Sequence, residues 1–95
     1  MVLMPSFYVY ILECLDTKKR KSYYTGYTQD LKKRFEQHRQ GKGAKYTKGK
    51  KLSLKHTEFF TNRAEAMQRE LAIKKMTKKQ KKELIQQEES IENVE

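Results

Sequence analysis

The segment SYYTGYT, residues 22–28, contains the side chains of this sequence that are best suited to chemistry. Three tyrosines and one glycine fall within it, directly after the basic run KKRK at residues 18–21. A tyrosine hydroxyl can accept or relay a proton when nearby cations favour its phenolate form and lower its pKa from about 10. Tyrosine rings can equally fill a sheet or stack on the bases of a nucleic acid. Residue type alone therefore leaves three interpretations open.

The alternation of side chains along a strand divides these aromatic residues between two faces of a sheet. Period-2 geometry puts Tyr24 and Gly26 on one face, with Tyr23 and Tyr27 on the other. We interpret Tyr23 and Tyr27 as packed rings with hydrated hydroxyls. Tyr24 is then the candidate for proton transfer. Gly26 beside it either gives a substrate room to approach or marks a bulge in the strand.

The helix predicted after this segment carries an arginine and a histidine one turn apart. It covers residues 29–40, with Thr28 interpreted as its N-cap and Gly41 as its stop. Arg34 and His38 flank the apolar stripe of this helix together. A guanidinium contacts phosphate with a planar, permanently charged fork, and its charge would also favour a nearby phenolate. Arg34 is therefore a candidate for binding a phosphate.

A second helix, predicted over residues 63–75, places a carboxylate inside its apolar arc. At about 100° per residue, Glu70 falls within an arc that includes Met67 and Leu71. An inward carboxylate needs a partner, and the helix leaves two interpretations open. Glu70 either forms an ordinary i, i+4 ion pair with Lys74, or it meets a metal ion or another polar group in a cleft.

The loop GKGAKYTKGKK, residues 41–51, contains three glycines and five lysines. Such a loop can follow a phosphate backbone. Its tyrosine could stack on an exposed base or anchor the loop, and both interpretations stay open. No element suited to reading base edges is evident, which favours recognition of backbone or branched shape over sequence. The candidate contacts with nucleic acid are Lys42, Lys45, Tyr46 and Lys48.

The overall charge points to the same class of partner. Lys and Arg number 22 against 12 Asp and Glu, which gives a net charge of +10. The positive excess lies in residues 1–85, because the last ten residues contain glutamates and no basic side chain. A body this basic attracts polyanions by its long-range field and by counterion release. Nucleic acid therefore leads the expected partners, with DNA ahead of RNA and acidic membrane surfaces behind both.

Several classes of protein are disfavoured by composition. No apolar run approaches the roughly 20 residues of a membrane-spanning helix, and the start MVLMPS is too short and weakly charged for a secretory signal. We therefore expect a cytoplasmic protein without membrane association. The single cysteine, Cys14, excludes an internal disulfide and a cysteine-rich zinc site, and we interpret it as a small buried hydrophobe.

The predicted elements form a small α/β fold of the α+β type. The first strand has two apolar faces and should be central in a three-stranded antiparallel sheet flanked by about three helices. The order is β-β-α-β-α-α. The expected strands are 7–15, 22–27 and 52–60, and the expected helices are 29–40, 63–75 and 78–89.

The chain is short enough for one compact core and therefore one domain. We expect capping boxes at residues 62–65 and 77–80, which begin the last two helices. The expected organisation is an N-terminal extension at 1–6, a single domain at 7–85, and an acidic, frayed or disordered tail at 86–95.

Taken together, these residues resemble the GIY-YIG nuclease domain. The tripeptides YVY at 8–10 and YTG at 24–26, followed by Arg34 and Glu70, occur in that family's order and spacing. The resemblance extends over about residues 7–85. The chain is similar to the small stand-alone bacterial members of the family and, more distantly, to the catalytic domains of Slx1-type structure-specific endonucleases.

The resemblance implies roles for individual residues and a divalent metal, Mg²⁺ or Mn²⁺. Two positions depart from the family pattern, Tyr8 for the first glycine and Thr25 within the second tripeptide. The polar residue that often follows the family's glutamate has no clear counterpart. Carried over by position, the implied catalytic residues are Tyr10, Tyr24, Arg34 and His38, the implied metal ligand is Glu70, and Gly26 is structural within its motif.

The functional expectation is a metal-dependent endonuclease that hydrolyses phosphodiester bonds in structured or branched DNA, in repair or recombination. One alternative is a non-catalytic module that binds DNA or RNA and retains the fold. Another is a lysine-rich accessory protein with a vestigial site. The sequence shows no attached DNA-binding or zinc domain, so we also expect a separate targeting protein. Which of Tyr10, Tyr24 and His38 acts as general base stays open.

Overall fold

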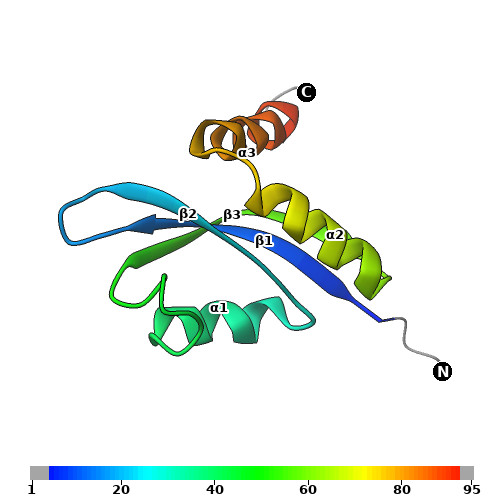
Figure 1. Cartoon of the computed structure of the whole chain (residues 1–95), viewed down its shortest axis with the longest axis horizontal. Helices are drawn as coiled ribbons and strands as arrows, with labels where there is room; N and C mark the ends of the chain where they lie inside the picture. The colour runs from blue at the N-terminus through cyan, green and yellow to red at the C-terminus, as the bar shows by residue number, and fades with distance from the viewer. Residues whose placement is uncertain (1–4, 93–95) are drawn as a thin grey trace.

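The computed structural model describes residues 5–92 of the chain, with side chains described to residue 87. The elements follow the predicted order, β-β-α-β-α-α (Figure 1). None of the helices within this described part is both long and apolar enough to cross a bilayer. The elements are β1 (Phe7–Leu15), β2 (Lys21–Thr28), α1 (Leu31–Arg39), β3 (Lys51–Phe60), α2 (Arg63–Lys74) and α3 (Lys78–Glu92).

The three strands form one antiparallel sheet in the order β2-β1-β3. The central position of β1 confirms the prediction from its two apolar faces, because only a strand covered on both sides can bury residues of both parities. The pairing of β1 with β2 is regular throughout. The pairing with β3 shifts between Ile11 and Leu12, whose partners are His56 and Leu54, so Lys55 is the extra residue of a bulge.

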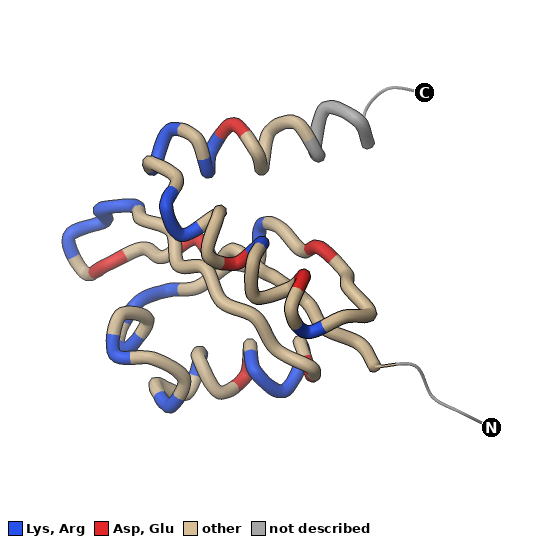
Figure 2. The backbone as a smooth tube through the Cα atoms, turned by 45° about the vertical axis from the view of Figure 1, so that its right-hand side comes forward, with Lys and Arg blue, Asp and Glu red and all other residues tan. Residues whose placement is uncertain are grey.

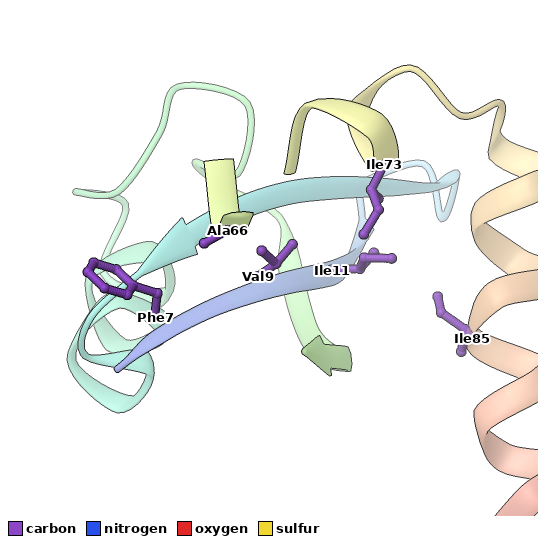
Figure 3. Packing of buried hydrophobic residues seen from close by; sticks show 6 residues of the cluster. All are labelled: Phe7, Val9, Ile11, Ala66, Ile73 and Ile85. Atoms are coloured by element: carbon purple, nitrogen blue, oxygen red, sulfur yellow. The ribbon is translucent and has the colours of Figure 1, made fainter. Parts of the chain in front are cut away.

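One face of the sheet is covered by α2 and α3 (Figure 1). Figure 3 shows Val9 and Ile11 pointing from β1 toward this layer, where Ala66 and Ile73 of α2 and Ile85 of α3 meet them. Each buried valine or isoleucine stabilises the fold by about 1.5–3 kcal/mol. Tyr23 and Tyr27 pack against the same cluster, as the alternation of β2 predicts.

The opposite face carries Tyr10, Leu12 and the buried free Cys14, and α1 lies against it. The apolar stripe of α1, Leu31 and Phe35, packs on this second cluster together with Tyr24 of β2 and Leu52 of β3. The face of β2 that carries Tyr24 and Gly26 is therefore the face covered by α1.

The start of α1 differs from the prediction. The N-cap is Asp30 rather than Thr28, because the Asp30 carboxylate accepts a 3.0 Å hydrogen bond from the backbone N–H of Lys33. Thr28 instead accepts from the backbone N–H of Asp30 at 3.1 Å and closes the turn before the helix. The helix ends as predicted, with Gly41 in the left-handed region at φ 78°.

The predicted caps of the last two helices are present. The Asn62 side chain accepts from the backbone N–H of Glu65 at 3.2 Å. Thr77 and Gln80 bond each other's backbone N–H reciprocally, at 3.1 and 2.8 Å. The α3 helix continues to Glu92, into the segment expected as an acidic tail, and residues 93–95 lie outside the described part.

The orientation of α2 corrects the predicted apolar arc. Met67 and Leu71 are 48% and 54% exposed, whereas Ala66 and Ile73 are fully buried. The helix rests on the sheet through the line from Ala66 to Ile73, which leaves half of the expected arc in solvent. Glu70 lies beside that line, and 17% of its side chain is exposed.

Candidate active site

A buried hydrogen bond joins Tyr10 at the centre of the sheet to His38 at the end of α1. The Tyr10 hydroxyl lies 2.8 Å from Nε2 of His38, and the two residues are 2% and 1% exposed. The His38 ring points at β1 because the apolar stripe of α1 rests on the same face of the sheet. The two rings meet edge to face, with centroids 5.8 Å apart.

A third buried residue, Thr47, determines which way this hydrogen bond runs. The Thr47 hydroxyl donates to the carbonyl of Ala44 at 3.0 Å, and its oxygen lies 2.9 Å from Nδ1 of His38. A hydroxyl has one proton, so its oxygen accepts from Nδ1–H of His38. Nε2 then carries the lone pair and accepts the proton of the Tyr10 hydroxyl. The pattern assigns a neutral imidazole whose Nε2 accepts the hydrogen bond from Tyr10.

The ionisation of both groups agrees with this assignment. Burial lowers the pKa of His38, and the charge of Arg34 lowers it further, which favours the neutral ring. Burial also raises the pKa of the Tyr10 hydroxyl, although a hydrogen bond from Arg34 and its charge oppose the rise. For Tyr10, desolvation therefore outweighs the neighbouring cation, and the resting hydroxyl is protonated.

Arg34 belongs to the same group of contacts. Its charge acts against the rise in the pKa of the Tyr10 hydroxyl, and its side chain donates to Oε1 of Gln37 at 3.3 Å. Tyr10 thus donates to an imidazole while a guanidinium lies within electrostatic range of it. A permanent positive charge stands beside the two groups that could exchange a proton.

Tyr24 and Gly26 of β2 border this group, on the face that alternation predicts. The Tyr24 ring meets the edge of the His38 ring, with centroids 5.2 Å apart. Gly26 pairs with Tyr10 in a regular register, which excludes the bulge interpretation. A Cβ on Gly26 would lie 2.5 Å from the Tyr10 hydroxyl oxygen, so glycine is required by the close approach of the ring.

Glu70 lies on α2, which covers the face of the sheet opposite Tyr10 and His38. Its negative charge contributes to the raised pKa of Tyr10, so the carboxylate lies within electrostatic range of that hydroxyl. It also pairs with Lys74, with Nζ 3.6 Å from Oε1. The structure shows the i, i+4 ion pair with Lys74, and the metal-binding interpretation of Glu70 stays a prediction.

The loop between α1 and β3 closes over the site. Tyr46 stacks on Tyr24 with centroids 6.1 Å apart, and Nζ of Lys50 lies 3.5 Å above the Tyr46 ring. The anchoring role considered for Tyr46 is thus present, while the ring stays 44% exposed. Gly43 approaches the His38 ring so closely that a side chain there would collide with Nδ1. The loop lysines expected to contact nucleic acid, Lys42, Lys45 and Lys48, are exposed.

Comparison with known proteins decides the family. The family model of the GIY-YIG catalytic domain matches residues 6–83. The chain belongs to the GIY-YIG family. This confirms the resemblance inferred from the two tripeptides and their spacing with Arg34, His38 and Glu70.

Relatives of this GIY-YIG chain include small proteins from bacteria and archaea. The UPF0213 protein VNG_2274C of Halobacterium salinarum is 46% identical over 78 residues, which cover 81% of this chain and 96% of that protein. The UPF0213 protein CPE1444 of Clostridium perfringens is 51% identical over 79 residues, covering 82% and 81%. The NMR structure of the UPF0213 protein BH0048 from Bacillus halodurans is 38% identical, with a TM-score of 0.50, covering 85% of this chain and 83% of that one.

The donor set of this GIY-YIG domain is compatible with one kind of metal. Within residues 5–87, no three His, Cys, Asp or Glu side chains gather as a metal-binding group. A closed transition-metal site of protein ligands is therefore a poor fit for the described residues. Mg²⁺ is different, because it retains several waters and binds through one or two carboxylates together with substrate phosphate oxygens. A single carboxylate, such as that of Glu70, meets this requirement.

Two contributors to the GIY-YIG site escaped the sequence reasoning. Thr47 was one of several polar residues in a lysine-rich loop, and nothing local to it indicates a buried hydroxyl. Gly43 could have been suspected, since a glycine between two lysines in a loop often permits close approach of the backbone to a neighbour. Both are recognised only through their contacts with His38, which comes from a different element.

Proposed function

We propose that this GIY-YIG protein is a metal-dependent endonuclease that hydrolyses phosphodiester bonds in DNA. One observation carries the proposal: the buried Tyr10 hydroxyl donates to the neutral imidazole of His38, and the charge of Arg34 acts on both groups. Fully satisfied buried polar groups of this kind are costly to assemble and serve no packing need that apolar side chains would not meet.

The proposed reaction uses His38 as the final proton acceptor. A water that attacks phosphorus must lose a proton, and Tyr10 can take it while its own proton passes to Nε2 of His38. Tyr24, on the same face and less buried, borders the position from which water would approach. Arg34 would bind the phosphate and stabilise the charge that develops on its oxygens.

Glu70 is the residue that would hold the divalent ion, Mg²⁺ or Mn²⁺. When bound, such an ion supplies positive charge to the phosphate and to the departing oxygen. The loose pair with Lys74 leaves the Glu70 carboxylate available, because Lys74 is about half exposed and can turn away.

The proposed substrate is structured or branched DNA, as in repair or recombination, and RNA ranks behind it. The exposed lysines and net charge of +10 support binding to phosphates, which carry no sequence information. The proposal includes work in the cytoplasm, together with a separate targeting protein.

A second candidate is a nucleic-acid-binding module without turnover. The observation that favours it is the ion pair of Glu70 with Lys74, which gives the carboxylate a role without a metal. The two candidates differ in whether bound DNA or RNA is cut.

A cleavage assay distinguishes the two candidates. The protein is incubated with labelled single-stranded, duplex and branched DNA and with RNA, in Mg²⁺, in Mn²⁺ and in chelator. We expect metal-dependent cleavage that falls about 100-fold or more in Tyr10→Phe, which removes the proposed proton relay, and in Glu70→Gln. The exposed Glu65 on the same helix provides the matched control, and Glu65→Gln should cut normally. Binding of every substrate without cleavage would establish the second candidate instead.

A further inference from the structure

A cluster of basic side chains at the tip of the β1–β2 hairpin takes no part in the candidate active site. Leu15, the last residue of β1, pairs with Lys21 on one side and with Lys51 on the other. Nζ of Lys78, at the start of α3, donates a hydrogen bond to the carbonyl of Lys21. Figure 2 shows basic residues of the hairpin tip, the start of β3 and the start of α3 at the same end of the molecule. We define the hairpin patch as Lys18, Lys19, Arg20, Lys21, Lys51 and Lys78.

Most of the positive charge of the hairpin patch is not neutralised. Its two nearby carboxylates are already used, Asp16 by Arg20 at 2.7 Å and Glu13 by Lys21 at 3.7 Å. The four other lysines of the patch form no ion pair with any carboxylate whose side chain the structure describes. Like charges held together repel each other, and an anion that binds there relieves the repulsion.

The backbone of Lys19 gives a second, independent reason to assign a function to this tip. Its φ of 62° lies in the left-handed region. A residue with a Cβ pays about 1–2 kcal/mol there, and glycine or asparagine would be the favoured choice. The turn is nevertheless firmly held, because Asp16 Oδ1 accepts from the backbone N–H groups of Lys18 and Arg20 at 2.9 and 2.8 Å. Folding alone therefore does not explain a lysine at this position.

Two ring contacts and one pair of chain neighbours connect Lys51 of the hairpin patch with the candidate active site. Lys51 follows Lys50, whose ammonium lies over the Tyr46 ring, and Tyr46 stacks on Tyr24. A nucleic-acid backbone that leaves Tyr24 along these residues arrives at the hairpin tip.

We propose that the hairpin patch is a second phosphate-binding site that holds duplex DNA beyond the position of cleavage. The inference rests on the proposed function, because it assumes that DNA occupies the site near Tyr24. Contacts of this kind read no base sequence, and they contribute affinity through the release of counterions. The role of Lys19 is to present an ammonium at the tip of a rigid turn.

The test is the salt dependence of DNA binding, measured by fluorescence anisotropy with a labelled duplex in chelator, so that no cleavage occurs. The variants are Lys19→Asn and the double variant Lys18→Gln with Lys19→Asn. The matched control is Lys32→Gln with Lys33→Gln, which removes the same charge at the start of α1, the opposite end of the sheet. In the hairpin variants, we expect the slope of log K against log salt to fall in magnitude by about 0.9 for each lysine–phosphate pair that is removed, and DNA binding to weaken several-fold. The control variant should show neither change.

A stability measurement accompanies the binding assay. Asparagine tolerates the left-handed region, so Lys19→Asn should unfold at the same temperature as the natural protein or higher. Weaker binding by a protein that is at least as stable supports the proposal. An unchanged slope in the hairpin variants, or an equal loss in the control, overturns the patch and leaves the proposed function standing. No duplex binding by the natural protein overturns the patch, whereas the proposed function falls only if the cleavage assay shows that branched DNA is not cut either.

Discussion

The hydroxyl of Tyr10 donates a 2.8 Å hydrogen bond to Nε2 of His38, although the two residues are 28 positions apart and both are buried. Its direction follows from Thr47, which occupies the other nitrogen of the ring. A proton donor and a neutral acceptor are thereby held in contact, away from bulk water and beside Arg34. This relationship is the part of the molecule on which mutations should be most informative.

Thr47 should act as a positioning residue for His38. Thr47→Val removes the acceptor of Nδ1–H and leaves a buried donor unsatisfied, so the free energy of unfolding should fall by about 1–3 kcal/mol. Thr47→Ser keeps the hydroxyl and should therefore keep the orientation and tautomer of the His38 ring. The ¹⁵N chemical shifts of His38 report the tautomer directly. Cleavage should fall in Thr47→Val and not in Thr47→Ser. If His38 has the same tautomer in Thr47→Val as in the natural protein, Thr47 does not position the ring.

The neutral state of His38 predicts a loss of stability in mild acid. Burial and the charge of Arg34 lower its pKa below the usual 6.5. The unfolded chain therefore binds a proton at His38 before the folded chain does. The contribution of neutral His38 to the free energy of unfolding is present above about pH 6.5, and it is lost as the pH falls through the folded-state pKa of His38.

Denaturant unfolding between about pH 8 and about pH 5 measures this effect. His38→Asn provides the reference, because every other titrating group is common to the two proteins. The stability advantage of the natural protein should shrink in acid. An advantage that stays constant over this range would show that His38 titrates alike in the folded and unfolded chains.

Gly26→Ala should destabilise the sheet at the site. The new Cβ would lie 2.5 Å from the Tyr10 hydroxyl oxygen and 2.7 Å from Cζ, and a buried, hydrogen-bonded ring has little room to retreat. We expect a loss of about 1–3 kcal/mol in the free energy of unfolding. Adding Tyr10→Phe removes the shorter contact and should restore part of the loss. Full stability of Gly26→Ala by itself would mean that the backbone yields instead.

A pair on the other face of the sheet predicts a change in stability without a change in the site. Arg69 of α2 donates to both carboxylate oxygens of Glu58 on β3, at 2.8 and 3.0 Å. Burial raises the pKa of Glu58, yet the hydrogen bonds from Arg69 and His56 outweigh it and lower the pKa overall. Arg69→Met leaves this carboxylate poorly compensated and should cost about 1–3 kcal/mol.

Two measurements check the Arg69 prediction. The double variant with Glu58→Gln should lose less stability than the sum of the single changes, because the two residues interact directly. The His38 ring signals should stay unchanged in Arg69→Met, because Glu58 pairs with Val9 on the face opposite Tyr10. Shifted His38 signals would show that the two faces are coupled.

Much of the fold could be predicted because its signals are local. Period-2 alternation assigned Tyr24 and Gly26 to one face, and two apolar faces placed the 7–15 strand at the centre. Caps at Asn62 and Thr77 involve residues three apart, so sequence spacing suffices for them. The misplaced cap at Thr28 shows the limit, because two good capping residues stand close together and only the backbone geometry chooses between them.

The sequence by itself therefore determined the order of the elements, the faces of the strands and the family, since these follow from short-range periodicity and from motifs. Only the tertiary structure decided that Thr47 orients His38. It also decided that Met67 and Leu71 face solvent. These depend on how helices and a loop are placed on the sheet, and no local pattern specifies the rotation of a helix about its own axis when its apolar arc is broad.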